Sequence, residues 1–296
     1  MSFRKAERKR AKLRLGITGP AGSGKTYGAL LIAFGLGGKI AMIDTENGSG
    51  DLYANVGDYD VCTLTAPYEI EKYLEAIHEA ENAGYDIIII DSLSHAWSGE
   101  GGLLDKQAKI TASSRSGNSY MAWRQVTPLH NRLIDAMLGS KCHIIATMRS
   151  KTEYIQTENE RGYKEIRKVG LAPVQREGMD YEFGTVFDLT ANHNATVSKD
   201  RTGIFDGEIF TISQDTGKIL KQWLDTGVDA ELRANLYRQY LERAGGDAAK
   251  AQEAMLAVTN GRASREWTDE DLKNLQENLA VLNEFNSKQE NSELVI

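Results

Sequence analysis

The sequence has no hydrophobic run that approaches the ~20 apolar residues of a membrane-spanning helix. Its charged N-terminus has no apolar core behind it, so no signal peptide is expected. The two cysteines, Cys62 and Cys142, stand alone, without the C-x-x-C or Cys/His spacing of a zinc site. Two isolated cysteines also argue against a disulfide-stabilised secreted domain. We therefore expect a cytoplasmic protein with no membrane partner.

Acidic side chains outnumber basic ones, 42 against 35, and two stretches carry a local excess of positive charge. The net charge is −7, which by itself disfavours a polyanionic partner. Residues 1–14 carry seven Lys and Arg against one Glu, whereas residues 227–296 carry eight basic and thirteen acidic side chains. Between Lys141 and Arg176, eight Lys and Arg stand against four Glu, a net of +4. Any contact with nucleic acid must therefore be local.

Strands and helices alternate through the first part of the chain. A continuous apolar run such as 86–90 is typical of a strand that is covered on both faces. Helical spacing appears at 67–83 and at 120–138, the latter with Pro128 as an expected kink. This alternation predicts an α/β fold with a mostly parallel central sheet, whose ligand lies at the carboxyl ends of the strands. The other expected strands are 13–18, 39–44, 142–147, 184–189, 195–199 and 208–213.

The remaining segments are expected to flank this core. Residues 3–13 contain good helix formers and predict a basic helix, either a solvated lead-in or a DNA-contacting arm. Residues 92–119 form a polar, Gly/Ser-rich stretch, and 151–169 predict two strands around a polar turn. Beyond Gly227 we expect three helices, at 229–243, 247–258 and 268–285, the last capped by Thr268.

The most informative stretch is Gly19-Pro20-Ala21-Gly22-Ser23-Gly24-Lys25-Thr26, which has the pattern G-x-x-x-x-G-K-T. It lies between an expected strand and an expected helix, the context of a phosphate-binding loop and not of a chance glycine-rich turn. Backbone N–H groups in such a loop surround phosphates at a helix N-terminus. Lys25 reaches the β- and γ-phosphates, and the Thr26 hydroxyl completes a Mg²⁺ shell. We predict ATP and Mg²⁺ as cofactors, with Tyr27 also at the nucleotide.

Two carboxylates follow expected strands. Asp91 ends an isoleucine-rich strand, and beside a phosphate-binding loop its natural partner is the Mg²⁺ shell; the alternative is an N-cap for the next segment. Glu46 lies just past the strand at 39–44, where a carboxylate can orient and deprotonate water near the γ-phosphate. The alternative for Glu46 is a surface residue in a loop.

These motifs resemble those of a known family. Ile43-Asp44-Thr45-Glu46 and Ile90-Asp91-Ser92 after the phosphate-binding loop are similar to the RecA-like recombinase core, in which the corresponding Glu is the catalytic base. Residues 198–203, Ser-Lys-Asp-Arg-Thr-Gly, resemble a segment of RecA- and DnaB-like ATPases whose two cations reach the γ-phosphate of a neighbouring subunit. The resemblance implies that Lys199 and Arg201 act in trans, where they would meet charge developing on the transferred phosphoryl group. Otherwise they are solvent-facing residues on an edge strand.

Residues 1–226 as a whole resemble phage-type RecA-like ATP-binding proteins, among them single-strand annealing proteins. The resemblance implies DNA-contacting loops at 92–119 and 151–180, the second of which contains most of the local positive charge. It also implies that Tyr53 stacks on adenine. An Asn-Gln pair expected after the fourth core strand is missing, so Thr147 or Arg149 is the candidate sensor of the γ-phosphate. The candidate DNA-binding residues are Lys151, Arg161, Lys164, Arg167, Lys168 and Arg176.

We therefore expect a RecA-like P-loop ATPase domain at 1–226 with a basic lead-in at 1–14, a small helical domain at 227–285 and a disordered tail at 286–296. The expected function is Mg-ATP-dependent hydrolysis with single-stranded DNA binding in phage recombination or replication, in the host cytoplasm. The expected partners are single-stranded DNA, further copies in a head-to-tail ring or filament, and a single-strand binding protein. Two alternatives stay open: a ring-forming helicase-like motor or loader, and an annealing module that uses ATP as a switch with little hydrolysis.

Overall fold

The computed structural model describes residues 5–6, 8–114, 117–158, 164–227, 229–264, 267–268 and 270–279, with the backbone alone at 152–158, 164–171 and 230–231. The chain divides into two compact units. One comprises residues 12–223, and the other combines the ranges 1–11 and 224–296. The basic arm, which we expected as a lead-in to the ATPase domain, thus groups with the C-terminal part of the chain.

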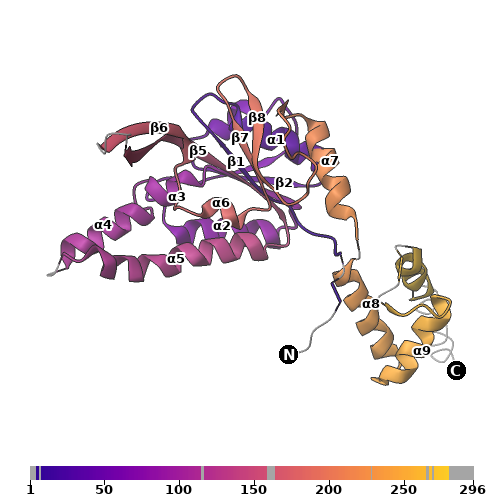
Figure 1. Ribbon diagram of the computed structural model, residues 1–296. Coiled ribbons are helices and arrows are strands. Elements are labelled where there is room, and N and C mark those ends of the chain that lie inside the picture. Colours follow the sequence, from indigo (N-terminus) through magenta and orange to yellow (C-terminus); the bar gives the residue numbers. More distant parts are fainter. Residues whose placement is uncertain are drawn as a thin grey trace. The chain divides into compact units, whose positions relative to one another are not determined.

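The larger unit is built on one twisted sheet with the order β3-β2-β4-β5-β1-β7-β8-β9 (Figure 1). The pairs from β3 through to β7 are parallel, whereas β8 and β9 are added antiparallel at one edge. The predicted α/β fold with a mostly parallel sheet is confirmed. The strands of this path are β1 (Arg14–Gly19), β2 (Ile40–Asp44), β3 (Asp60–Thr63), β4 (Ile87–Asp91), β5 (His143–Glu158), β7 (Thr185–Leu189), β8 (Asn194–Asp200) and β9 (Phe210–Thr211).

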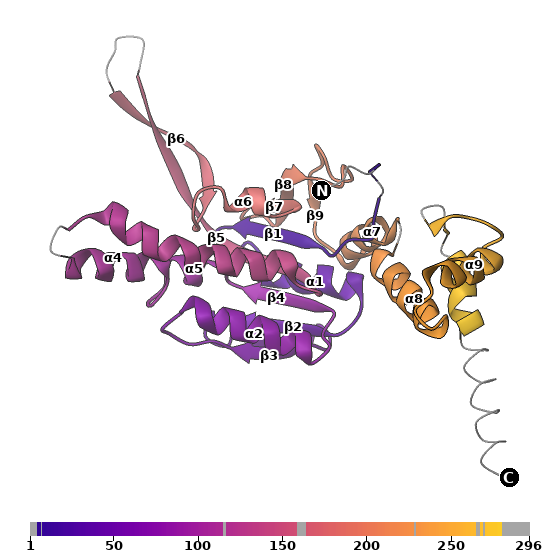
Figure 2. The ribbon, with the colours of Figure 1, turned by 90° about the horizontal axis from the view of Figure 1, so that it is seen from below.

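Strand β5 belongs to two pairings in succession. Its first part lies between β1 and β4 in the central sheet, with Ile144 beside Arg14 and Ile88. From Ser150 onward it pairs antiparallel with β6 (Lys164–Pro173). Figure 2 shows this hairpin extending away from the sheet. One strand therefore runs from the centre of the molecule into a projecting hairpin, in agreement with the two strands expected at 151–169.

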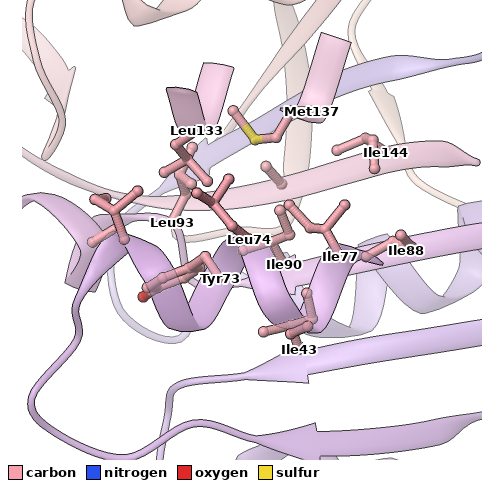
Figure 3. Close-up of a cluster of buried hydrophobic side chains, with 14 of the residues drawn as sticks. Ile43, Tyr73, Leu74, Ile77, Ile88, Ile90, Leu93, Leu133, Met137 and Ile144 are labelled. Carbon is pink, nitrogen blue, oxygen red and sulfur yellow. The ribbon is translucent and has the colours of Figure 1, made fainter. Parts of the chain in front are cut away.

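The sheet is covered on both faces, and successive side chains of each strand point to opposite faces. Toward one face, Ile43, Ile88 and Ile90 pack against Tyr73 and Ile77 of α2 (Ile70–Asn82), as Figure 3 shows. Helix α5 (Ser119–Gly139) closes the same cluster with Leu133 and Met137 and runs without interruption past Pro128. On the other face lies α1 (Lys25–Leu36), which contacts β1, β4 and β5.

Helices α1 and α7 (Gln214–Asp225), the latter absent from our sequence-based expectations, come unusually close. A Cβ at Gly35 would lie 2.0 Å from the carbonyl oxygen of Gln214, and one at Gly217 would lie 2.2 Å from that of Ile32. Glycine at both positions lets the two backbones touch. This contact fixes the helix that follows the phosphate-binding loop.

The stretch 92–119, expected as a polar loop, instead contains helices α3 (Ser94–Ser98) and α4 (Leu103–Ser113). The expectation was wrong because it gave more weight to the Gly and Ser residues of this stretch than to its apolar residues. Leu103 and Ile110 lie on the same face of a helix and pack against the core. Helix α4 packs against α5, and Figure 1 shows the two helices extending together beyond the sheet. A short helix, α6 (Met179–Glu182), follows β6, and a 3₁₀ turn, η1 (Ser49–Tyr53), follows β2.

The smaller unit has its own apolar core around Leu236, Tyr240 and Met255. Two of its helices are α8 (Ala230–Arg243) and α9 (Ala248–Val258), as expected. The third begins where predicted, since the Thr268 hydroxyl accepts the Asp271 N–H at 3.2 Å; residues 280–285 of the predicted helix and the tail at 286–296 lie outside the described residues.

The basic arm is not helical where it is described, at Lys5, Ala6 and 8–13. Its polar groups bond instead to the last turn of α7 and the residue that follows it: the Ala11 N–H donates to the carbonyl of Leu224 at 3.2 Å, and Arg8 Nε donates to the Thr226 hydroxyl at 2.9 Å. Helix propensity predicted the arm wrongly because these tertiary partners take its donors.

Candidate nucleotide-binding site

The phosphate-binding loop joins the end of β1 to the start of α1. Gly22 and Gly24 have φ angles of 74° and 87°, values that disfavour any residue with a Cβ. Lys25 turns back over the loop, with its ammonium 3.0 Å from the Gly19 carbonyl and 2.8 Å from that of Pro20. The buried Ser23 hydroxyl has no hydrogen-bond partner among the described residues. A glycine-rich loop at a helix N-terminus, with a nearby cation and an unpaired hydroxyl, fits a triphosphate.

Asp91, at the end of β4, lies beside that loop and is only 2% exposed. The Thr26 hydroxyl donates to one of its carboxylate oxygens and the Thr147 hydroxyl to the other. Burial raises the pKa of Asp91, and these two hydrogen bonds offset only part of the effect. No cluster of three or more His, Cys, Asp or Glu that could hold a metal occurs in the part of the chain that the structure describes. Thr26 and Asp91 therefore fit a Mg²⁺ ion that takes its other ligands from phosphate and water.

Glu46 lies beyond the end of β2, on the same edge of the sheet. Its carboxylate accepts a hydrogen bond from the Ser92 hydroxyl at 2.9 Å and a two-pronged ion pair from Arg149, with Nε at 3.0 Å. Burial would raise the pKa of Glu46, but the hydrogen bonds from Arg149 and Ser92 outweigh it, and the pKa lies below its usual value. Glu46 is therefore ionised at neutral pH, as a general base must be.

Asp44 and Thr45 hold the end of β2 in place. Asp44 accepts the N–H groups of Glu46 at 2.6 Å and Gly50 at 3.1 Å, which fixes the turn that carries Glu46. Thr45 joins β2 to β4: its N–H donates to the Asp91 carbonyl at 2.7 Å, and its hydroxyl accepts the Ser92 N–H at 2.8 Å. The same hydroxyl contacts His95 Nδ1 at 2.7 Å. Sequence reasoning missed the support from Ser92 and His95, since each lies nearly fifty positions from its partner.

A hollow of about 480 Å³ adjoins the phosphate-binding loop. The rings of Tyr27 and Tyr53, both expected at the nucleotide, lie 6.0 Å apart and line it. His193, with Nδ1 3.1 Å from the Ser23 carbonyl, and Ile212 form other parts of the wall. A mostly apolar, aromatic hollow beside a triphosphate cradle suits a nucleobase. Sequence reasoning missed His193 and Ile212, which are brought here by the pairing of β7, β8 and β9 and carry no local motif.

Lys199 and Arg201 do not reach this site within the chain. Lys199 pairs with Val186 of β7, and the Arg201 N–H donates to the Gly184 carbonyl at 2.9 Å, so both lie at the start of β7. The phosphate-binding loop follows the end of β1, which runs parallel to β7. The two cations thus lie toward the amino-terminal ends of the parallel strands, whereas the phosphate-binding loop lies at their carboxyl ends. Lys199 Nζ donates to the Asp180 carbonyl at 3.1 Å.

The expected DNA-binding residues lie on or next to the β5–β6 hairpin. Lys151 is exposed near its start. Arg176 follows it and lies 6.0 Å above the ring of Trp123. The backbone of Lys164, Arg167 and Lys168 forms β6, and Arg161 falls outside the described residues.

Comparison with known proteins gives one assignment. A family described as an AAA domain matches residues 11–254. No curated protein matches the chain. None of the helices in the described parts is long and apolar enough to cross a membrane. With most of its length matched, and with a phosphate-binding loop at the carboxyl edge of a mostly parallel sheet, the chain belongs to the AAA domain family of P-loop ATP hydrolases.

Proposed function

We propose that this ATPase binds Mg-ATP and single-stranded DNA, in phage recombination or replication, and that it acts as a head-to-tail oligomer. The observation that carries the proposal is the course of β5. Thr147 contacts Asp91 and Arg149 contacts Glu46, and the same strand continues into the β5–β6 hairpin, which carries most of the expected DNA-binding residues. A ligand on the hairpin and a nucleotide beside Thr147 and Arg149 would both act on this one element.

In this proposal each side chain has a defined task. Mg²⁺, when bound, shields the phosphates and orients them for attack. Lys25 holds the phosphates, while Thr26 and Asp91 hold the metal ion. Glu46 accepts the proton of the attacking water, which requires that its pair with Arg149 opens toward the solvent.

The trans arrangement rests on the distance of Lys199 and Arg201 from their own chain's loop. Because the two cations lie at the start of β7, away from their own chain's phosphate-binding loop, another copy of the chain would have to bring them to a γ-phosphate. Cations at that position would stabilise charge in the transition state.

Two measurements test the proposed function. The first is the ATPase rate with and without single-stranded DNA over a salt series; stimulation by DNA, and affinity that falls steeply with salt, are expected. Reversal of charge at Lys164, Arg167 and Lys168 should remove the stimulation. The second mixes Lys25→Ala protein with Lys199→Ala/Arg201→Ala protein. Restored hydrolysis supports shared sites, whereas inactive mixtures of correctly assembled protein would rule them out.

A further inference from the structure

A second hollow, of about 760 Å³, lies apart from the nucleotide site and is lined chiefly by aromatic rings. Trp97 of α3 and Trp123 of α5 stack at 5.7 Å between centroids, with 20° between their planes. Tyr120 and Tyr181, at other parts of the wall, are 73% and 72% exposed. The Arg176 guanidinium lies 6.0 Å above Trp123. Large rings exposed to this degree around one hollow mark a binding surface.

The hollow lies between α5 and the segment that follows the β5–β6 hairpin. On one side are α4 and α5, where residues 103–139 carry five Lys and Arg against two Asp. On the other is the β5–β6 hairpin, residues 150–173, which carries five Lys and Arg against four Glu, with Arg176 just beyond it. Figures 1 and 2 show that the hairpin and the α4–α5 pair extend from the same end of the sheet. In a chain with a net charge of −7, this concentration of positive charge complements a polyanion.

The hollow is also connected to the ATPase site. The Ser94 hydroxyl accepts the Arg149 N–H at 2.9 Å, and Ser94 begins the short helix α3 that carries Trp97. Arg149 in turn pairs with Glu46. A shift of Arg149 therefore acts on the helix that forms one wall of the hollow.

We propose that this aromatic hollow receives unpaired bases of a single-stranded nucleic acid, while the hairpin and the α4–α5 pair contact its phosphates. The inference rests on the proposed function and names the surface that reads the bases. Every nucleobase has a π-face, so rings of Trp and Tyr bind bases without regard to sequence, and Arg adds a planar cation. Phosphates on either side of a stacked base would then meet positive charge.

The test uses the full-length protein and two labelled strands of equal length, an oligothymidylate and an abasic strand. Tyr120→Ala/Tyr181→Ala is the test variant, since both rings are exposed and their loss spares the core. Tyr237→Ala on α8, 41% exposed, is the matched control. We expect the double variant to lose about five- to one hundredfold in affinity for oligothymidylate. Its affinity for the abasic strand, and the slope of affinity against salt, should match those of wild type.

Three outcomes would overturn the inference. The wild-type protein could bind both strands equally, or the Tyr237 variant could lose as much affinity as the double variant. The loss could also follow a change of oligomeric state in sedimentation, which would assign the hollow to a contact between copies of the chain. Absence of binding to either strand by the wild-type protein would instead refute the proposed function itself.

Discussion

Arg149 holds the carboxylate of Glu46 in a two-pronged ion pair, although the two residues are 103 positions apart in the chain. Glu46 follows β2, and Arg149 lies where β5 leaves the central sheet for the hairpin. The carboxylate suited to activate water is thus held by the strand that continues into the hairpin. An ion pair of this kind lowers the basicity of Glu46 for as long as it is closed.

The first prediction concerns Glu46 itself. Glu46→Gln keeps the size and polarity of the side chain but cannot accept a proton. We expect ATP binding close to wild type and a fall in kcat of at least about a hundredfold. Equilibrium binding of a labelled nucleotide and a steady-state ATPase assay separate the two effects. Hydrolysis at the wild-type rate would remove Glu46 from the mechanism.

The second prediction concerns Arg149 and pH. The pKa of Glu46 lies below its usual value chiefly because the hydrogen bonds from Arg149 and Ser92 outweigh its burial. Arg149→Ala should therefore raise the pKa, and the acid limb of kcat against pH should move to higher pH, because the carboxylate becomes protonated earlier as the pH falls. Arg149→Lys keeps the positive charge but cannot form the two parallel hydrogen bonds of a guanidinium. The acid limb of this variant should therefore fall between those of wild type and Arg149→Ala. An unmoved acid limb in the Ala variant would show that the pair does not control Glu46 during turnover.

The third prediction concerns the metal site. Thr147→Val removes the hydroxyl that donates to Asp91 and leaves one buried carboxylate oxygen unpaired. We expect a higher Mg²⁺ concentration for half-maximal ATPase activity. Thr185→Val is the matched control, because Thr185 is equally buried and donates to Asp200 at 3.3 Å, away from the phosphate-binding loop. If both variants need the same higher Mg²⁺ concentration for half-maximal activity, the effect comes from a general loss of stability and not from the metal site.

The local sequence pattern was sufficient to locate those parts of the site that each lie at the end of one strand. The loop from Gly19 to Thr26, Glu46 and Asp91 could each be located because an apolar run stops where a polar group begins. The contacts between these parts could not, since the pairing of Arg149 with Glu46 depends on β5 lying beside β4 and β4 beside β2. The same holds for His193, which reaches the loop only through the turn between β7 and β8.

Local pattern also misled in two places. The arm at 8–13 has helix-forming residues, but its hydrogen-bond donors find partners at 224–226. The Gly and Ser residues of 92–119 predicted a loop, but this stretch contains helices α3 and α4. A few apolar residues that face the core decide its structure. In both cases tertiary contacts outweigh intrinsic propensity.

The fourth prediction concerns the contact of α1 with α7. Gly35→Ala would place a methyl group 2.0 Å from the Gln214 carbonyl, so the helices must separate. We expect a loss of about 1–3 kcal/mol in the free energy of unfolding, measured by denaturant titration. Gly139→Ala serves as the control, because a Cβ there has open space and Ala favours the helix. A Gly35 variant as stable as the control would show that the two helices can shift apart at little cost.

The fifth prediction concerns His130, a buried residue of α5 beside Trp97. Burial, reinforced by the charge of Arg176, lowers its pKa from 6.5 to about 4. The folded chain therefore keeps His130 neutral at pH values where the unfolded chain protonates it. Its contribution to stability is complete above about pH 6.5 and is lost progressively as the pH falls toward 4.

His130→Phe removes this titration and keeps an aromatic ring in the core. We expect the thermal unfolding midpoint, followed by tryptophan fluorescence, to fall less steeply for the variant than for wild type between pH 6.5 and 4. Parallel curves for wild type and His130→Phe would mean that another group dominates acid unfolding.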